Sequence, residues 1–352
     1  MTTTATELDV RALTEADDPA VIELLGVALG GGPTGGRTAE FFRWKHRLKP
    51  FGSSPGLVAV HGGRIVGVRL FMRWALQADG QPVKALRAVD TATDPAFQGK
   101  GIFRSLTLGL LDQLDASGEV DLVFNTPNAS SRPGYLKMGW QPVGTLPVRL
   151  APVRPLRFLR GGRAASGATA GAKKPAATAT GKALPSCPLP SAVSVLAERH
   201  REVEELVAAG ASTHRFHTPL SMEYLSWRYG SAPGLDYRAV AIDSGGTLSG
   251  LAFGRLRQRG PLAEFTLADI LVADGDRRSA GRLLRAARRS GADYVAAHTS
   301  TGTEVERAAS AAGYLRVPGN GIGLVANPRR PIAASAVEPA AWRLSLGDLE
   351  VF

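Results

Sequence analysis

The alternation of apolar and polar residues in the N-terminal part of the chain predicts two helices followed by a β-hairpin. Apolar residues recur at helical spacing over residues 15–29 and again over the aromatic segment 38–47. Two short apolar runs, 57–60 and 65–71, flank the Gly62-Gly63 pair. Paired glycines between apolar runs are typical of the tight turn of an antiparallel hairpin.

The pattern from residue 83 to residue 140 switches from strand to helix and back. It predicts a strand over 83–91, a helix with an apolar face after Gly101, a short buried strand over 120–125 and an aromatic helix before Gly139. This order of elements is neither all-parallel nor all-antiparallel. We therefore expect an α/β fold in which a mixed sheet carries helices on both faces.

The chain after residue 190 repeats six short patterns of the first half in the same order. Examples are Glu40-Phe41-x-x-Trp44-Lys45 with Glu223-Tyr224-x-x-Trp227-Arg228, and Ala88-Val89-Asp90 with Leu267-Ala268-Asp269. The shared order predicts an internal duplication. The second copy has GDRRSAG in place of FQGKGIF and Ala309 in place of Tyr135. We therefore expect the second copy to be a degenerate domain without chemistry of its own.

The length of 352 residues and the composition divide the chain into two domains and a linker. We expect an N-terminal domain over 1–153, a linker over 154–190 and a C-terminal domain over 191–352 that ends in a strand. The linker is rich in Ala, Gly and Pro, and residues 151–190 carry seven basic residues and no acidic one. They supply +7 of the net charge of +11, so the remaining charge does not by itself indicate a nucleic-acid partner.

Several classes of protein are not expected from the composition. The single cysteine, Cys187, excludes an intramolecular disulfide and a clustered-cysteine zinc site, and the six histidines show no metal-ligand spacing. We therefore expect no metal. No apolar run approaches the roughly 18 residues of a membrane span, and the first residues lack a signal-peptide pattern. We expect a cytoplasmic protein with no membrane segment.

The turn Gln98-Gly99-Lys100-Gly101 lies between a predicted strand and a predicted helix. The first-turn amides of a helix have no internal partners and the helix dipole is positive there, so a turn without bulky side chains can bind phosphate or pyrophosphate. On its own the turn is better explained as a plain tight connection. It matches neither GxxxxGK[ST] nor GxGxxG, so nucleotide hydrolysis and dinucleotide redox chemistry are not expected.

A second motif follows the next strand, and it makes the turn a candidate binding site. Together the two motifs resemble those of the GCN5-related N-acetyltransferase (GNAT) superfamily, whose acyl-CoA turn has the form [Q/R]xxGx[G/A] and whose later helix reads NxxAxxxYxKxG[F/W]. The residues at these positions are Gln98, Gly101 and Phe103, and then Asn128, Ser131, Tyr135, Lys137, Gly139 and Trp140. Phe103 and Ser131 depart from the pattern. Pro133 and Gly134 also depart from it and should shorten or bend the helix before Tyr135.

The resemblance implies transfer of an acetyl or other acyl group from acyl-CoA, as cosubstrate, to an amine. A direct ternary-complex attack fits, because no activated cysteine or serine nucleophile is evident. The residues implied in acyl-CoA binding are Val89, Thr91, Gln98, Gly99, Lys100, Gly101, Ile102, Phe103, Asn128 and Ser131.

The resemblance also implies one catalytic residue, and the proton that the attacking amine must lose calls for a second. Tyr135 would be the general acid that protonates the departing thiolate, although it is also explained as a packing residue. Asp90 is the candidate general base, directly or through water, although a strand-end cap explains it equally well. The carboxylate of the C-terminal Phe352 is a further candidate base, because some tandem relatives use their C-terminus in this way.

Two other functions stay open at this stage. One is a transferase that takes its acyl group from aminoacyl-tRNA, and the other is a non-catalytic module that binds acyl-CoA. The acceptor is an amine-bearing small molecule or peptide. The identity of the acceptor, the acyl chain length and the oligomeric state stay open.

Overall fold

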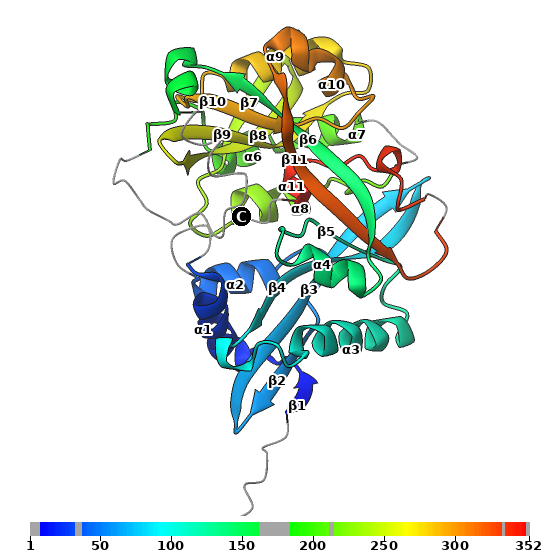
Figure 1. The fold of residues 1–352 in the computed structure, drawn as a ribbon. Helices are drawn as coiled ribbons and strands as arrows, with labels where there is room; N and C mark the ends of the chain where they lie inside the picture. Colours follow the sequence, from blue (N-terminus) through cyan, green and yellow to red (C-terminus); the bar gives the residue numbers. More distant parts are fainter. Residues whose placement is uncertain (1–7, 32–36, 162–183, 211–214, 333–334, 350–352) are drawn as a thin grey trace, which may run out of the picture.

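The computed structural model describes residues 8–31, 37–161, 184–210, 215–332 and 335–349, and it contains one mixed sheet of 11 strands (Figure 1). The strands are β1 (Asp9–Ala12), β2 (Gly56–His61), β3 (Arg64–Ala78), β4 (Gln81–Thr93), β5 (Leu122–Asn125), β6 (Gln141–Pro152), β7 (Arg238–Ser244), β8 (Thr247–Arg259), β9 (Leu262–Val272), β10 (Tyr294–His298) and β11 (Leu315–Pro328). Their order across the sheet is β1-β2-β3-β4-β5-β11-β6-β10-β9-β8-β7.

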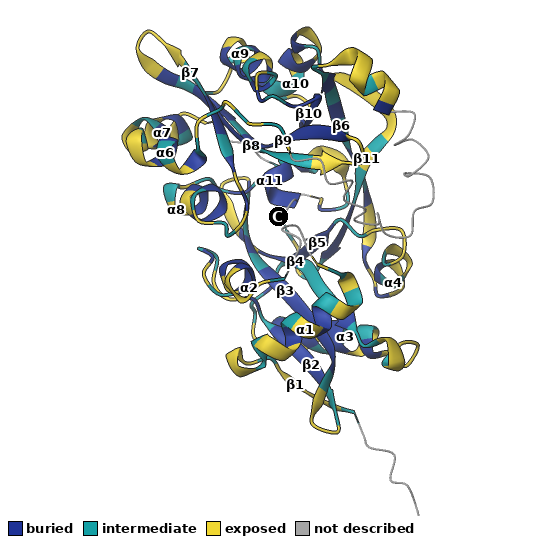
Figure 2. Ribbon diagram, turned by 90° about the vertical axis from the view of Figure 1, so that its left-hand side faces the viewer, coloured by how far each residue is buried: buried dark blue, intermediate teal, exposed yellow. Residues whose placement is uncertain are grey.

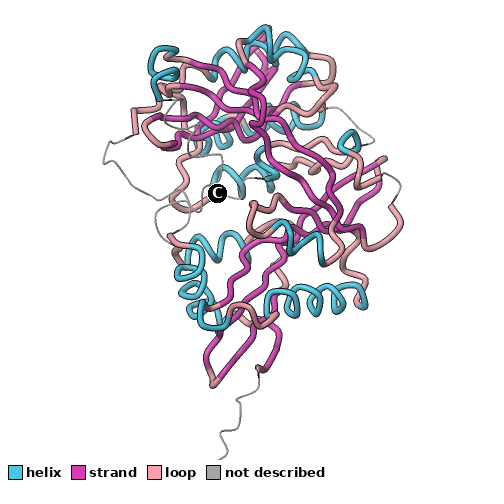
Figure 3. The backbone as a smooth tube through the Cα atoms, viewed as in Figure 1, coloured by secondary structure: helices cyan, strands magenta, loops and turns pink. Residues whose placement is uncertain are grey.

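The helices lie on both faces of this sheet, as Figure 3 shows. They include α1 (Asp18–Leu29), α2 (Ala39–His46), α3 (Ile102–Ala116), α4 (Arg132–Lys137), α6 (Ala192–Glu198), α7 (His200–Ala208), α8 (Met222–Leu225), α9 (Arg277–Ala287), α10 (Glu304–Ala309) and α11 (Leu346–Leu349). The predicted helices over 15–29 and 38–47, the hairpin β2–β3 and the mixed α/β class are confirmed. Among the described residues, no helix has the length and apolar character to cross a bilayer.

The two halves of the chain, residues 8–161 and 184–349, follow the same element order. The N-terminal half runs β2-β3-β4-α3-β5-α4-β6, and the C-terminal half runs β7-β8-β9-α9-β10-α10-β11. In each half the strand before the long helix pairs in parallel with the strand after it. The similarity between the two halves of the sequence therefore extends to the order and pairing of their strands.

The last strands of the two halves change places in the sheet. β11 pairs antiparallel with β5, β6 pairs antiparallel with β10, and β6 and β11 pair with each other in the middle. We call this arrangement the strand exchange. The sequence predicts two domains, each with its own mixed sheet. Because of the strand exchange, these two sheets are joined into one.

A pair of tryptophans joins the halves on one face of the sheet. Trp44 on α2 and Trp227 of the C-terminal half stack with ring centroids 5.0 Å apart. Each indole N–H donates to the backbone carbonyl of the other residue, at 2.9 and 3.1 Å. Both residues come from the repeated Glu-aromatic-x-x-Trp pattern, so equivalent positions of the two halves contact each other.

The N-terminal half has a different helix pair on each face. Alternate residues of a strand point to opposite faces. Phe71 belongs to the buried cluster under α3 and α4, whereas Leu70 belongs to the cluster under α1 and α2. Figure 2 shows the buried strands between helices whose outer surfaces are exposed. β4 and β5 are thus accessible to side chains from α2 on one face and α4 on the other.

The expected terminal strand is wrong. Trp342 forms only an isolated bridge with Phe216, and the chain then turns into the short helix α11. Trp342 packs against Phe124, and Arg87 donates to the carbonyl of Leu349 at 2.8 Å. The alternating apolar residues are buried as expected, but the neighbouring strands of the sheet already have partners, so this segment fills the space between the halves instead.

Candidate functional site

The strands β4 and β5 separate near the middle of the N-terminal half. Their parallel pairing covers Ala85–Arg87 and Leu122–Phe124, and β4 then continues to Thr93. Val89 and Thr91 lie opposite Leu70 and Arg69, so Asp90 is an extra residue, a β-bulge, with φ of +38°. The splay therefore exposes the β5-facing backbone of β4 beyond Arg87, next to a strained residue.

The turn Gln98–Gly101 follows β4 and leads into α3. All four of its residues are exposed. Gly99 and Gly101 both have φ of +78°, and an added Cβ would have no neighbour within 4 Å at either position. Gly101 is the N-cap of α3, and no side chain caps the helix. The first-turn amides of α3 therefore face a site without bulky side chains, with Lys100 beside it.

The matching helix of the C-terminal half begins differently. The side chain of Asp276 accepts a hydrogen bond of 2.8 Å from the amide of Ser279 and so caps α9. A carboxylate at this position also satisfies the helix dipole. The N-terminus of α9 is therefore occupied by the chain itself, whereas that of α3 is not.

The two motif residues before Tyr135 build the start of α4. The Asn128 side-chain oxygen accepts hydrogen bonds from the amides of Ser130 and Ser131, at 3.0 and 2.9 Å. Pro133 falls in the first turn of the helix, where its missing N–H breaks no hydrogen bond. The helix is only six residues long, which is the shortening expected from the sequence.

Tyr135 lies buried beneath α4, with 3% of its surface exposed. Its ring packs edge-on against Phe103 and Trp140, at centroid distances of 5.5 and 5.2 Å. Its hydroxyl oxygen accepts a hydrogen bond of 2.9 Å from Arg69 Nη1 on β3. The tyrosine is thus held at a fixed position near the first turn of α3.

The two unusual residues Phe103 and Gly134 depend on each other. A Cβ added to Gly134 would lie 3.0 Å from Phe103 Cε1, which is closer than side chains normally approach. A side chain in place of Gly134 would therefore have to displace the aromatic ring of Phe103 by a few tenths of an ångström. Ile102 beside it is buried under α3, so the helix presents its backbone rather than this side chain to the turn.

Asp90 faces α2, on the opposite face of the sheet from Tyr135. Its carboxylate accepts hydrogen bonds from Lys45 Nζ at 2.5 Å, His46 Nε2 at 2.9 Å and Arg37 Nη1 at 3.3 Å. Burial opposes ionisation, but the Lys45 charge, the His46 hydrogen bond and Arg37 outweigh it and hold the pKa of Asp90 well below its ordinary value. Asp90 is therefore an ionised carboxylate within a basic cluster.

A chain of hydrogen bonds leads from this cluster to Lys49. Burial lowers the pKa of His46 to about 4, so the imidazole is neutral. Since Nε2 donates to Asp90, Nδ1 accepts from the Ser54 hydroxyl at 2.9 Å, and Lys49 Nζ donates to Ser54 at 2.6 Å. Burial lowers the pKa of Lys49 to about 7.

Several residues of this site were missed in the sequence. The basic residues around Asp90 come from the segment 37–49, and Arg69 comes from the middle of β3. The one available signal for Arg69 was a charged residue inside the apolar run Gly67–Phe71. Lys45 and His46 are the last two residues of the aromatic helix α2, and the sequence gave no signal that they would reach β4.

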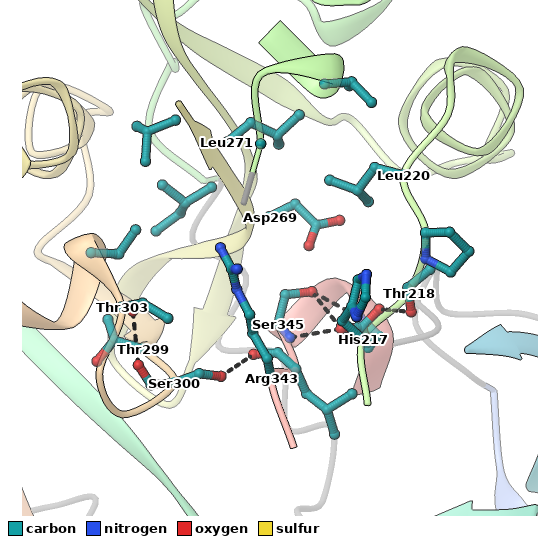
Figure 4. Close-up of a pocket in the computed structure, with 18 of the residues that line it drawn as sticks. His217, Thr218, Leu220, Asp269, Leu271, Thr299, Ser300, Thr303, Arg343 and Ser345 are labelled. Carbon is teal, nitrogen blue, oxygen red and sulfur yellow. Dashed lines mark hydrogen bonds between the residues drawn. The ribbon is translucent and has the colours of Figure 1, made fainter. Parts of the chain in front are cut away.

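A separate cavity of about 380 Å³ lies in the C-terminal half (Figure 4). It opens between β9 and the residues after β10, which is the counterpart of the β4–β5 splay, and residues 343–348 line another side. Asp269 points into it, and Ser300 donates to the Leu344 carbonyl at 2.8 Å. This half was expected to be chemically silent, and it nevertheless has a polar cavity.

Asp348 is the buried acid of this cavity with the most unusual titration. It accepts a hydrogen bond of 2.5 Å from the Thr218 hydroxyl. Burial and the nearby charge of Asp269 raise the pKa of Asp348 to about 7. In the part of the chain that the structure describes, no group of three or more His, Cys, Asp or Glu residues is placed to hold a metal ion. Phe352, the alternative base, lies outside the described residues.

Comparison with known proteins agrees with the motifs. Residues 9–143 match the family model of the acetyltransferase (GNAT) domain. No curated protein matches the sequence.

Similar solved structures extend the likeness in fold to most of the chain. They include a probable N-acyltransferase of Enterococcus faecalis V583 (TM-score 0.63, 11% identity, covering 92% of this chain and 73% of that one). GCN5-related N-acetyltransferases of Anabaena variabilis ATCC 29413 (0.58, 10%, 92% and 73%) and Kribbella flavida (0.56, 15%, 93% and 72%) are also similar. At these identities the likeness shows a common fold.

Replacing Asp90 by Asn should destabilise the protein by roughly 3–5 kcal/mol, because it leaves buried basic groups without their carboxylate. Urea denaturation followed by circular dichroism measures this loss. Asp112→Asn, at an exposed position on α3, should leave the midpoint unchanged. Equal midpoints for Asp90→Asn and the wild type would contradict the ionic role of Asp90.

Asp348 should make the protein less stable as the pH rises. A carboxyl group whose pKa is raised on folding, here from 3.8 to about 7, binds its proton more tightly in the folded state. The contribution of Asp348 to the free energy of unfolding should therefore fall between about pH 4 and pH 7, whereas that of His46 rises over much of the same range. Asp348→Asn removes the falling part and should make the slope of the free energy of unfolding with pH more positive. Urea titrations across that range test it, with the exposed Asp236→Asn as a control that keeps the slope. An unchanged slope in Asp348→Asn would contradict the assignment.

Proposed function

Residues 9–143 belong to the GNAT superfamily, and on this premise we propose that the protein transfers an acetyl or other acyl group from acyl-CoA to an amine. The observation that carries the proposal is the uncapped N-terminus of α3 beside the β4–β5 splay. The capped N-terminus of α9 is the internal contrast, because the same scaffold there has no place for a phosphate.

Acyl-CoA would bind along β4. The first-turn amides of α3 and the turn Gln98–Gly101 would hold its pyrophosphate, with the charge of Lys100 at the rim. The backbone of Val89 and Thr91, at the splay, would pair with the amides of the pantetheine arm. The thioester would then lie between β4 and β5, between the faces that carry Asp90 and Tyr135.

The reaction needs one proton acceptor and one proton donor. The neutral amine attacks the thioester carbonyl, the C–S bond breaks, and Tyr135 gives its proton to the departing thiolate. Asp90, directly or through water, would accept the proton that the amine loses. Its low pKa makes it a poor place for a proton to stay, so the proton would pass on to water. The hydrogen bonds from Lys49 through Ser54 and His46 all donate toward Asp90, so this chain would keep the carboxylate ionised for the next turnover.

We also infer that the chain arose by duplication and that only the N-terminal half carries out the transfer. The support is the repeated element order, the contact between Trp44 and Trp227, and a matched pair of acids. His46 bonds Asp90 in one half, and Tyr229, at the equivalent position, bonds Asp269 in the other. The C-terminal half keeps the scaffold and lacks the open turn.

The basic linker does not require a nucleic-acid partner. Arg154 and Arg157, at its start, lie 3.4 and 3.1 Å from the buried carboxylate of Asp293. At least these two positive charges are therefore paired with a carboxylate of the chain itself. We propose a small molecule or peptide amine as the acceptor.

Gly101→Trp should weaken acetyl-CoA binding by on the order of tenfold or more, because the indole would fill the pyrophosphate site. Gly275→Trp is the matched control. Gly275 precedes α9, has φ of +75° against +78° for Gly101, and likewise has open space around it, so both variants carry the same backbone strain. Calorimetric titration measures both affinities. Equal affinities in the two variants would contradict the site.

Tyr135→Phe should lower kcat by roughly 10²- to 10⁴-fold while leaving acetyl-CoA affinity nearly unchanged, because it removes the proton donor and keeps the ring packing. Steady-state release of free thiol with a panel of amines measures turnover. The exposed neighbour Leu136→Ala serves as the control and should keep its rate. An unchanged kcat in Tyr135→Phe would contradict the role of proton donor and would mean that Tyr135 only packs.

A further inference from the structure

Arg69 is a buried cation without a carboxylate partner. It lies in the middle of β3 with 0% of its surface exposed, and it forms no ion pair with any described residue. Another buried arginine, Arg149, does have such a partner and lies 2.6 Å from Glu306. A buried charge without a counter-ion is costly, so Arg69 needs an explanation other than stability.

The surroundings of Arg69 are aromatic. Its guanidinium carbon lies 4.4 Å from the ring centroid of Phe71, 5.5 Å from that of Tyr135 and 5.9 Å from that of Phe103. Ring faces attract cations, but they do not satisfy N–H donors. Of its polar atoms, Nη1 donates to Tyr135 Oη at 2.9 Å, whereas Nε and Nη2 have no hydrogen-bond partner among the described residues.

The single hydrogen bond of Arg69 fixes the direction in which Tyr135 can donate. A guanidinium has only donors, so the Tyr135 oxygen must be the acceptor in this contact. The hydroxyl proton of Tyr135 therefore points away from Arg69 and is available to another group. Once that proton has left, the phenolate oxygen faces a positive charge at 2.9 Å in a water-poor setting, where such a contact is strong.

We propose that Arg69 is the positioning residue of the acyl transfer, directing the proton of Tyr135 to the leaving thiolate and stabilising the phenolate that remains. This inference rests on the proposed function. The amine nitrogen forms the new C–N bond and loses one proton, the C–S bond breaks, and the sulfur takes the Tyr135 proton. The proton from the amine returns to the phenolate through solvent, so the products are the amide and CoA thiol.

A rival role for the same cation is binding the pyrophosphate of acyl-CoA. Phe103, which Arg69 contacts, is in the first turn of α3, where the pyrophosphate is proposed to bind. Two observations favour the leaving group instead: the one hydrogen bond goes to Tyr135, and Arg69 is buried whereas the turn Gln98–Gly101 is exposed. The two roles differ in whether affinity or turnover depends on Arg69.

The test compares Arg69→Met, Arg69→Lys, Tyr135→Phe and the double variant Arg69→Met/Tyr135→Phe in the full chain. Arg69→Met should lower kcat at least about 100-fold, Arg69→Lys should recover part of it, and acetyl-CoA affinity should stay within about twofold of the wild type. The double variant should be no slower than Tyr135→Phe alone, because both changes remove one function. Arg69→Met should melt at or above the wild-type temperature, since it removes an uncompensated buried charge.

Arg149→Met is the matched control, because it removes a buried arginine that has a carboxylate partner. It should lower the melting temperature and keep kcat. A fall in melting temperature for Arg69→Met with unchanged kcat would overturn the proposal, as would weaker acetyl-CoA binding with unchanged kcat. Additive losses in the double variant would also overturn it. If the wild type itself neither binds nor turns over acetyl-CoA, the proposed function fails first and the inference falls with it.

Discussion

The strand exchange is the constraint on which the rest of the structure depends. Because β11 completes the sheet beside β5 and β6 completes it beside β10, each half contains a strand that the other half needs. An unpaired central strand would expose its whole backbone, so the halves are expected to fold as one unit. The mutual hydrogen bonds of Trp44 and Trp227 also join the two halves on one face of the sheet. They hold α2 where Lys45 and His46 reach Asp90.

Within this shared scaffold, two differences between the halves concern charge. One long helix begins at a bare glycine turn and the other at a capping aspartate. One β-strand acid is surrounded by basic groups and stays ionised, whereas the other, Asp269, lies beside Asp348 and has a raised pKa. The N-terminal half is therefore suited to an anionic cosubstrate, and the C-terminal half provides the support and contains the polar cavity of about 380 Å³.

Much of the fold could be predicted because its signals are local. The helices, the hairpin and the glycine turn follow from residues adjacent in the chain, and the motif around Tyr135 located the candidate site. The strand exchange could not be predicted, because the apolar pattern of β6 or β11 is the same whichever strand lies beside it. The contacts of Arg69 with Tyr135 and of Arg37 with Asp90 join residues 66 and 53 positions apart, and no short-range pattern records them.

Binding of acyl-CoA at the bare N-terminus of α3 is tested most directly by hydrogen–deuterium exchange of the backbone amides. The amides of residues 98–104 are the proposed ligands, and those of residues 275–281 are their counterparts in the C-terminal half. Saturating acetyl-CoA should slow exchange in residues 98–104 and leave residues 275–281 unchanged. Unaltered exchange at residues 98–104, or protection confined to the C-terminal half, would contradict it.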